Sequence, residues 1–356
     1  MKPLMKTSTL FAAMLTATTL VVGLSADVSY NTAMAAEVEG PKLNWNLSTW
    51  GKRRAFTEGL EALSAHIKEK TDGNFDIKIH YGGALSKPRE NLDGISLGAF
   101  EMASFCASYH PDKNRAATVL ELPMLPVPNG DVQKAIDLAV YNHPYTQKEM
   151  ARWNARILMS AALPQYEFMG KGEPPRKLED FSGMRVRALG GIGEAMKVLG
   201  AVPTTVTAPE TYQAIESGTV DAAAFAFYSH FSYRINEVST WRTTNLAPGS
   251  VNCPAVVNID AYNSLPDQYK ALMDEAVDKA YVALNEAYGA AIDKYTPVAD
   301  EAGIEKITYT QEELDKFRET AASPVWEAWV EKQTAAGVPA QELLDLVLKT
   351  AAEASQ

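Results

Sequence analysis

The stretch over residues 178–228 alternates β-rich runs with helical patterns, and this alternation most constrains the fold. The β-rich runs cover 184–188, 203–206 and 220–225. Strand, helix, strand, helix, strand within about fifty residues is typical of an open α/β sheet. Gly200 and Gly218 stand where the helices should end, because glycine accepts the left-handed conformation that closes a helix. We therefore predict a mostly parallel sheet here.

The carboxyl ends of these strands should form a binding cleft, as they do in open α/β sheets. The first strand would present Arg187 there, and the third would present Phe225, Phe227 and Tyr228. A guanidinium beside an aromatic wall suits a small organic anion. Arg185 shares the strand face of Arg187, so the pattern leaves open that one of them is a surface charge.

An earlier part of the chain has the same order of elements. Residues 42–50 and 75–81 alternate as strands, and an apolar stripe from Phe56 to Ile67 predicts a helix between them. The segments 98–105 and 218–225 match as glycine, any, apolar, acid, any, Ala, small, Phe. We expect two similar lobes that place residues 106–110 opposite residues 224–228.

The chain should cross between the lobes at least twice, because residues 156–163 and 251–259 read as strands that leave and re-enter the first lobe. Residues 264–296 predict a helix on the order of 45 Å long that could brace both lobes. Two shorter helices broken near Gly289 are the alternative. The predicted division is lobe I from 36–163 plus 249–290, and lobe II from 164–248 plus 291–356.

The N-terminus has the pattern of a secretory signal peptide. Lys2 and Lys6 precede an uncharged run over 7–26, and Ala33-Met34-Ala35 offers small residues to a signal peptidase. We expect residues 1–35 to be cleaved and the mature chain to be periplasmic. An uncleaved membrane anchor is the alternative, and no other segment is apolar enough to span a bilayer.

Composition and motifs exclude several function classes. The net charge of −11, without a long Lys or Arg run, argues against a nucleic-acid partner. The five histidines have no metal-ligand spacing, and the chain has no H-E-x-x-H, G-x-S-x-G, P-loop or C-x-x-C motif. The run Gly190-Gly191-Ile192-Gly193 lacks the acid that would bind a ribose, so we predict a tight turn.

The two cysteines, Cys106 and Cys253, leave two alternatives open. In an oxidising compartment they could form a disulfide, but buried free thiols are the alternative that we favour, because cysteine often behaves as a small apolar residue. Cys106 with His110 also leaves a cleft enzyme conceivable, with a nucleophile and a base on one loop.

Three segments resemble the substrate-binding proteins of tripartite ATP-independent periplasmic (TRAP) transporters: FSGMRVRALGGIGEAMKVLGAVPTT, AIESGTVDA and VVNIDAYNSLPDQYKALMDEA. The resemblance extends over essentially the whole mature chain. It implies an α/β fold with two lobes, similar to type II periplasmic binding proteins, and a long helix spanning both. It also implies a receptor, not an enzyme, that captures a small organic anion and delivers it to TRAP membrane permease subunits. A receptor for an ABC permease or a sensor kinase is the alternative.

The resemblance also assigns candidate site residues. In the family an arginine at the position of Arg187 clamps the substrate carboxylate. The branch that binds 2-oxo acids and other monocarboxylates is the nearest one, and its Glu-Trp pair, whose Glu helps to hold a metal ion, is Ala224-Phe225 here. We therefore expect no metal and no cofactor. The sialic-acid branch has a second arginine near the position of Glu167, and its absence here argues against a second charged clamp. The predicted ligand-binding residues are Arg187, Gln165, Trp50, Phe225, Tyr109, Tyr166, Phe227 and Cys106, with ordinary core packing as the alternative for several of them.

Overall fold

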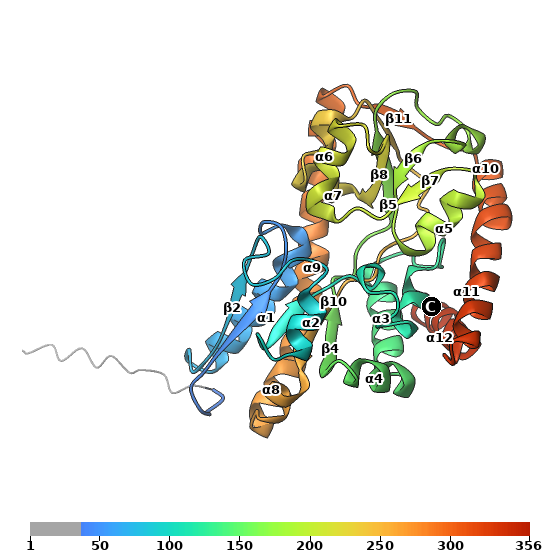
Figure 1. Cartoon of the computed structure of the whole chain (residues 1–356). Coiled ribbons are helices and arrows are strands. Elements are labelled where there is room, and N and C mark those ends of the chain that lie inside the picture. The colour runs from blue at the N-terminus through green and yellow to red at the C-terminus, as the bar shows by residue number, and fades with distance from the viewer. Residues whose placement is uncertain (1–36) are drawn as a thin grey trace, which may run out of the picture. The chain divides into compact units, whose positions relative to one another are not determined.

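The computed structural model describes residues 37–356, so the predicted signal peptide lies outside the described residues. The described chain contains two β-sheets (Figure 1). The first has the strand order β2-β1-β3-β10-β4, in which β1, β2 and β3 are parallel and β10 runs antiparallel to both of its neighbours. Its strands are β1 (Leu43–Ser48), β2 (Phe75–His80), β3 (Met102–Ser104), β4 (Ala155–Ser160) and β10 (Pro254–Asn258).

The second sheet has the order β11-β9-β5-β8-β6-β7 and contains the stretch from which the fold was predicted. Strands β6, β7 and β8 are parallel as expected, whereas β5 runs antiparallel to β8 and β9. Gly200 and Gly218 have φ values of +82° and +75°, so both adopt the left-handed conformation expected of them. The strands are β5 (Tyr166–Gly170), β6 (Arg185–Arg187), β7 (Val202–Thr204), β8 (Ala222–Ala226), β9 (Trp241–Thr243) and β11 (Glu305–Ile307).

Helices pack on both sheets and connect their strands (Figure 1). Helix α1 buries the predicted apolar stripe completely, since Phe56, Leu60, Leu63 and Ile67 are each at most 5% exposed. The α-helices other than α9 are α1 (Ala55–Lys70), α2 (Asn91–Ser96), α3 (Gly130–Asn142), α4 (Pro144–Ala151), α5 (Gly190–Val198), α6 (Thr211–Glu216), α7 (Phe227–Ser232), α8 (Ile259–Asn263), α10 (Gln311–Phe317), α11 (Ser323–Ala335) and α12 (Ala340–Ala354). The α/β fold class predicted from the sequence is therefore confirmed.

Helix α9 is a single helix of 35 residues, Asp267–Glu301. At 1.5 Å per residue it is about 52 Å long. It passes through Gly289 without a break, so the alternative of two shorter helices is wrong, and it also contains Pro297, beyond the predicted end. Pro297 cannot donate to the carbonyl of Asp293, but both residues are exposed, so water can bind that carbonyl.

Contacts on both sides fix α9 in place. The helix packs along α1 and also against α7 (Figure 1). The Tyr281 hydroxyl accepts a hydrogen bond from the Ser160 amide at 2.9 Å, and Tyr295 stacks on Phe231 with ring centroids 4.7 Å apart. The predicted role of this helix as a brace for both lobes is confirmed.

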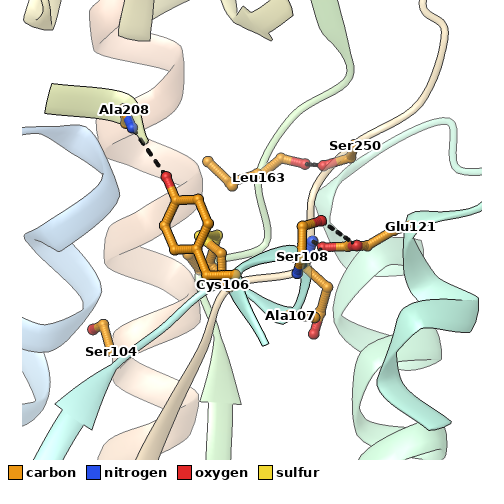
Figure 2. Close-up of a disulfide and its surroundings, with 12 residues drawn as sticks. Ser104, Cys106, Ala107, Ser108, Glu121, Leu163, Ala208 and Ser250 are labelled. Carbon is orange, nitrogen blue, oxygen red and sulfur yellow. Dashed lines mark hydrogen bonds between the residues drawn. A yellow bond between two sulfur atoms is a disulfide. The ribbon is translucent and has the colours of Figure 1, made fainter. Parts of the chain in front are cut away.

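The two predicted crossings between the sheets lie side by side. The chain leaves the first sheet after β4 and returns to it before β10. The Ala161 amide donates to the Cys253 carbonyl at 2.9 Å, and the Tyr166 amide donates to the Gly249 carbonyl at 2.8 Å. Figure 2 shows a third bond, in which the Ser250 hydroxyl donates to the Leu163 carbonyl at 2.8 Å. The hinge is therefore a hydrogen-bonded pair of segments.

The C-terminal helices contact elements on both sides of this hinge. Helix α12 packs on α3, and Trp326 of α11 donates to the Pro123 carbonyl at 2.7 Å. Helix α11 also touches α5, which follows β6 of the second sheet. The assignment of residues 291–356 to lobe II stays a prediction, as do the other lobe boundaries.

Candidate functional site

Arg187 is the last residue of β6, and its side chain is buried with 1% exposure. Its Nε donates to the Val206 carbonyl at 3.0 Å and its Nη1 to the Ala224 carbonyl at 2.8 Å. The guanidinium lies 4.0 Å from the centroid of the Phe225 ring. Two hydrogen bonds and a ring therefore hold the cation in one orientation, and within residues 37–356 no acidic side chain forms a salt bridge with it.

A buried guanidinium without an acidic partner is energetically unfavourable, because the protein interior does not replace the water that solvated the charge.

Arg185 differs from Arg187 although it lies two residues away on the same strand. Its side chain is half-exposed and binds the Asp221 carboxylate through Nε and Nη2. Of the two arginines that the alternating pattern left open, Arg185 is the surface charge.

Side chains from both sheets converge with Arg187 on one cavity. Six of the eight predicted ligand-binding residues line it: Trp50, Cys106, Tyr109, Tyr166, Arg187 and Phe225. The segments that follow β3 and β8 both contribute, so the expected placement of residues 106–110 opposite residues 224–228 is confirmed. The cavity volume is about 20 Å³, which is room for about one water molecule. An organic acid can enter only if side chains or lobes move apart.

Two hydrogen bonds hold the cavity shut by joining the first-sheet side to the second-sheet side. The Tyr109 hydroxyl accepts from the Ala208 amide at 3.0 Å (Figure 2). Arg89 donates through Nη2 to the Thr205 carbonyl at 3.0 Å. Tyr109 belongs to the segment after β3, whereas Ala208 and Thr205 follow β7. The conformation is therefore a closed one.

Gln165 and Phe227 lie outside this cavity. Both line a larger pocket of about 450 Å³ beside the hinge, which also includes Tyr288 and Ile292 of α9. Strand β8 ends at Ala226 and α7 begins at Phe227, so the strand alternation that would have turned Phe227 towards Arg187 stops there. The helical turn brings Tyr228 to the cavity, as expected, together with Ser229. A ligand contact for Gln165 or Phe227 stays a prediction.

Sequence reasoning missed Arg54, whose side chain lines the cavity. Its guanidinium lies 4.5 Å from the ring centroid of Phe56 and 5.4 Å from that of Tyr233. The sequence analysis argued against a second charged clamp because no arginine lies near Glu167, and it did not consider arginines elsewhere in the chain. Glu167 itself binds the Thr243 hydroxyl and the Ala247 amide. The pair Arg53-Arg54 gave no signal for which of the two side chains turns inward.

Cys106 and Cys253 form a disulfide (Figure 2). The preferred alternative of two free thiols is therefore wrong, although both residues are buried as that alternative required. The residues are 147 positions apart, and no local pattern predicts a pairing at that separation. The bond also removes the thiol that the cleft-enzyme alternative needed, since a disulfide sulfur is no thiolate nucleophile.

Removal of the disulfide should lower stability, because the bond closes a long loop and restricts the unfolded chain. We expect the double variant Cys106→Ala/Cys253→Ala to lose about 2 to 5 kcal/mol of unfolding free energy. Urea denaturation of the variant and of the native protein, with and without reductant, measures this. An unchanged midpoint in the variant would show that the disulfide contributes nothing to stability.

Glu121 is a buried carboxylate that joins the segment carrying Tyr109 to the returning crossing. It accepts hydrogen bonds from the Ser108 amide at 3.3 Å, from the Ser108 hydroxyl and from the Asn252 amide at 3.1 Å (Figure 2). Burial raises the pKa of Glu121 to about 7, and these hydrogen bonds only partly oppose the rise.

The first turn of α5, at Gly190-Gly191, packs directly on Glu121. A Cβ atom at Gly190 would meet the Glu121 carboxylate, and one at Gly191 would meet the Glu121 backbone carbonyl. Gly190 also has a φ of +51°. These glycines therefore permit a close approach of backbone between the two sides of the cavity. The run from Gly190 to Gly193 is the first turn of helix α5, so the predicted tight turn is wrong.

Glu121 should make the protein less stable as the pH rises. Between its ordinary pKa of 4.5 and its folded value of about 7, the folded protein holds a proton that the unfolded chain has released. The unfolding free energy should fall across this window by up to about 3 kcal/mol. Glu121→Gln keeps an acceptor for the two amides and should remove this part of the fall.

Urea denaturation at pH 5 and pH 8 tests the prediction. Asp137, whose pKa burial also raises to about 7, contributes in the same direction. His110 and His230, whose pKa values burial lowers to about 4 and about 3, contribute in the opposite direction. The prediction therefore concerns the difference in pH dependence between the native protein and the variant. Equal pH dependence in the native protein and in Glu121→Gln would contradict it.

Among residues 37–356, no helix is long and apolar enough to cross a membrane.

Comparison with known proteins places the chain in a family. A chain from Nostoc sp. named "Monocarboxylate 2-oxoacid-binding periplasmic protein all3028" is 25% identical over 341 residues, which cover 89% of this chain and 90% of the relative.

Two solved structures have the same fold. One is a marine metagenome TRAP solute-binding protein, described as specific for aromatic acid ligands, in complex with 3-hydroxybenzoate. Its TM-score is 0.80 at 16% identity, with 89% of this chain and 100% of that chain covered. The other is a TRAP solute-binding protein from Rhodoferax ferrireducens in complex with benzoate. Its TM-score is 0.78 at 17% identity, with 88% and 98% covered. The predicted two-lobed fold is thereby confirmed.

The family model for DctP, described as bacterial extracellular solute-binding protein, family 7, matches residues 48–333. This match covers most of the chain and includes every residue that lines the cavity around Arg187. The chain therefore belongs to the DctP family of bacterial extracellular solute-binding proteins.

Proposed function

We propose that the protein closes its two lobes around one small organic acid, binds the carboxylate at Arg187, and delivers the acid to a TRAP membrane permease. The single observation that carries this proposal is the buried guanidinium of Arg187, which no acidic side chain within residues 37–356 neutralises. A carboxylate can take two charge-assisted hydrogen bonds from a guanidinium. An anionic ligand would therefore supply what the described chain does not.

The walls of the cavity favour an aromatic acid or a 2-oxo or hydroxy acid. Trp50, Tyr166 and Phe225 surround Arg187 with aromatic surface, and the disulfide adds an apolar sulfur pair. The relatives support this class, because their names and complexes refer to a 2-oxoacid, 3-hydroxybenzoate and benzoate. One buried cation surrounded by rings matches a carboxylate attached to a flat, partly apolar body.

Export and docking follow from the same family. The signal-peptide pattern over residues 1–35 would release the mature protein into the periplasm. TRAP permease subunits are the proposed partner because the structures with the same fold are TRAP solute-binding proteins. A receptor of this kind binds its ligand and releases it unchanged, so we assign no catalytic residue.

Replacement of Arg187 tests the proposal most directly. Removing one partner of a buried charge pair costs about 2 to 5 kcal/mol, so Arg187→Ala should weaken ligand binding about 30-fold to several thousand-fold. Arg187→Lys keeps the charge but loses the planar fork, and it should recover only part of the affinity. Isothermal titration with the tightest acid from a thermal-shift screen of organic acids provides the measurement.

Arg185→Ala is the matched control, because Arg185 lies on the same strand and its charge is satisfied by Asp221 on the surface. Its affinity should stay within about threefold of the native value. Near-native binding in a folded Arg187→Ala variant would contradict the proposed site.

Metal independence is a second expectation, because Ala224 stands where the resembling branch has its metal-binding carboxylate. Ligand affinity with and without a chelator should agree within about threefold, well under the 1.4 kcal/mol of a tenfold change. A tenfold or greater loss with the chelator would show that other oxygen ligands hold an ion beside the acid.

A further inference from the structure

Arg54 is a second guanidinium that lines the same cavity as Arg187 and contacts the same group of aromatic rings. The Arg187 guanidinium lies 4.0 Å from the centroid of Phe225, and Phe225 stacks on Tyr233 with centroids 5.6 Å apart and planes at 23°. The Arg54 guanidinium in turn lies 5.4 Å from the centroid of the Tyr233 ring. The order along these contacts is cation, ring, ring, cation.

Arg54 has hydrogen-bonding capacity that the described chain does not use. Its Nη1 donates to the carbonyls of Trp50 and Lys52, both at 2.9 Å. A guanidinium carries five N–H groups, and no side chain or carbonyl within residues 37–356 accepts from Nε or Nη2 of Arg54. Its neighbour Arg53 forms salt bridges with Glu58 and Glu61, whereas Arg54 has no such partner in the same range.

Two hydroxyl groups beside Arg54 also have no partner in the described chain. The Tyr228 and Tyr233 hydroxyls are buried and form no hydrogen bond among residues 37–356. Both side chains line the cavity together with Arg54 and Arg187. Tyr228 as a whole is only 3% exposed. A buried hydroxyl without a partner is unfavourable, so these groups indicate a polar ligand atom at this end as well.

The chain leaves room for a ligand to extend past Arg54. Arg54, Tyr228 and Tyr233 line both the small cavity at Arg187 and an open pocket of about 510 Å³. Two further cations, Lys52 and Lys294, line that pocket with Arg53, whose charge is paired. Glu58 is the one acidic residue among those that line it, and it pairs with Arg53, so cations outnumber acids in this pocket.

We propose that Arg54 forms a second anion subsite, so that the cavity prefers elongated diacids with one anionic group on Arg187 and the other on Arg54. The body between the two groups would lie along Phe225 and Tyr233, and the tyrosine hydroxyls would donate to the distal anion. This inference rests on the proposed function, because it needs an acid bound at Arg187. It adds a specificity determinant: Arg54 separates diacids from matched monoacids.

The test compares two pairs of acids, and in each pair one member has a single carboxylate and the other has two carboxylates on the same ring or on a chain of the same length. The probes are benzoate with benzene-1,4-dicarboxylate, and hexanoate with hexanedioate, titrated by calorimetry into the native protein, Arg54→Gln, Arg54→Ala and Arg53→Ala. The native protein should bind the diacid of at least one pair about tenfold or more tightly than its monoacid. Arg54→Gln should weaken diacid binding much more than monoacid binding, and so lose most of that preference.

The ratio of the two affinities separates a ligand contact from a structural role. If Arg54 only held the Trp50 and Lys52 carbonyls, its replacement would weaken both members of a pair equally, and the inference would be overturned. Arg54→Gln retains an amide that can donate to those carbonyls, so it covers the case in which Arg54→Ala does not fold. Arg53→Ala is the control for general loss of positive charge and should keep the native ratio.

The failure of this inference differs from the failure of the proposed function. Monoacids that bind through Arg187 as tightly as their diacids, or more tightly, would overturn the second subsite and leave the proposed function intact. If neither these probes nor any member of an organic-acid library bound the native protein, the proposed function would fail, and the second subsite with it.

Discussion

The burial of the Arg187 charge is the constraint on which the rest of the cavity depends. A guanidinium at 1% exposure needs both a fixed orientation and compensation for the lost water. The backbone provides the orientation through the carbonyls of Val206 and Ala224. Neutral carbonyls solvate a cation without cancelling its charge, so the folded chain holds a site with a net positive charge in an apolar surrounding. In such a surrounding an anion interacts far more strongly than it would in water.

The hinge explains how this site can be both closed and accessible. Two antiparallel segments, fixed to each other by backbone hydrogen bonds and by the Ser250–Leu163 bond, connect the sheets (Figure 2). The disulfide and Glu121 tie the segment that carries Tyr109 to the returning crossing. The cavity wall on that side therefore has little freedom of its own. Opening should be a movement of one lobe relative to the other about the crossings, because the local walls are held by covalent and hydrogen bonds.

The sequence predicted those parts of the fold that periodicity determines, and failed where a single residue changes the local rule. The stripe on α1 and the alternation in β1 and β2 repeat over many residues, so chance errors average out. Phe227 was assigned to the cleft because it follows the carboxyl end of the third predicted strand, but the chain becomes helical at that residue and Phe227 lines a different pocket. Arg53 and Arg54 differ only in which way each side chain turns, and the disulfide depends on long-range proximity. Neither property has a local pattern, so only the three-dimensional structure reveals them.

Charge couples ligand binding to closure. In the closed conformation Arg187 is sealed from water while Arg54 faces the same cavity, and Tyr109 and Arg89 form hydrogen bonds to the opposite side. Without an anion, closure leaves the Arg187 cation in a poorly solvated space, and this cost opposes the gain from the Tyr109 and Arg89 hydrogen bonds. With an anion, the same closure strengthens the attraction, because water that screened it is expelled. A ligand shifts a conformational equilibrium only by its difference in affinity for the two states, and burial of the Arg187 guanidinium creates that difference for anions.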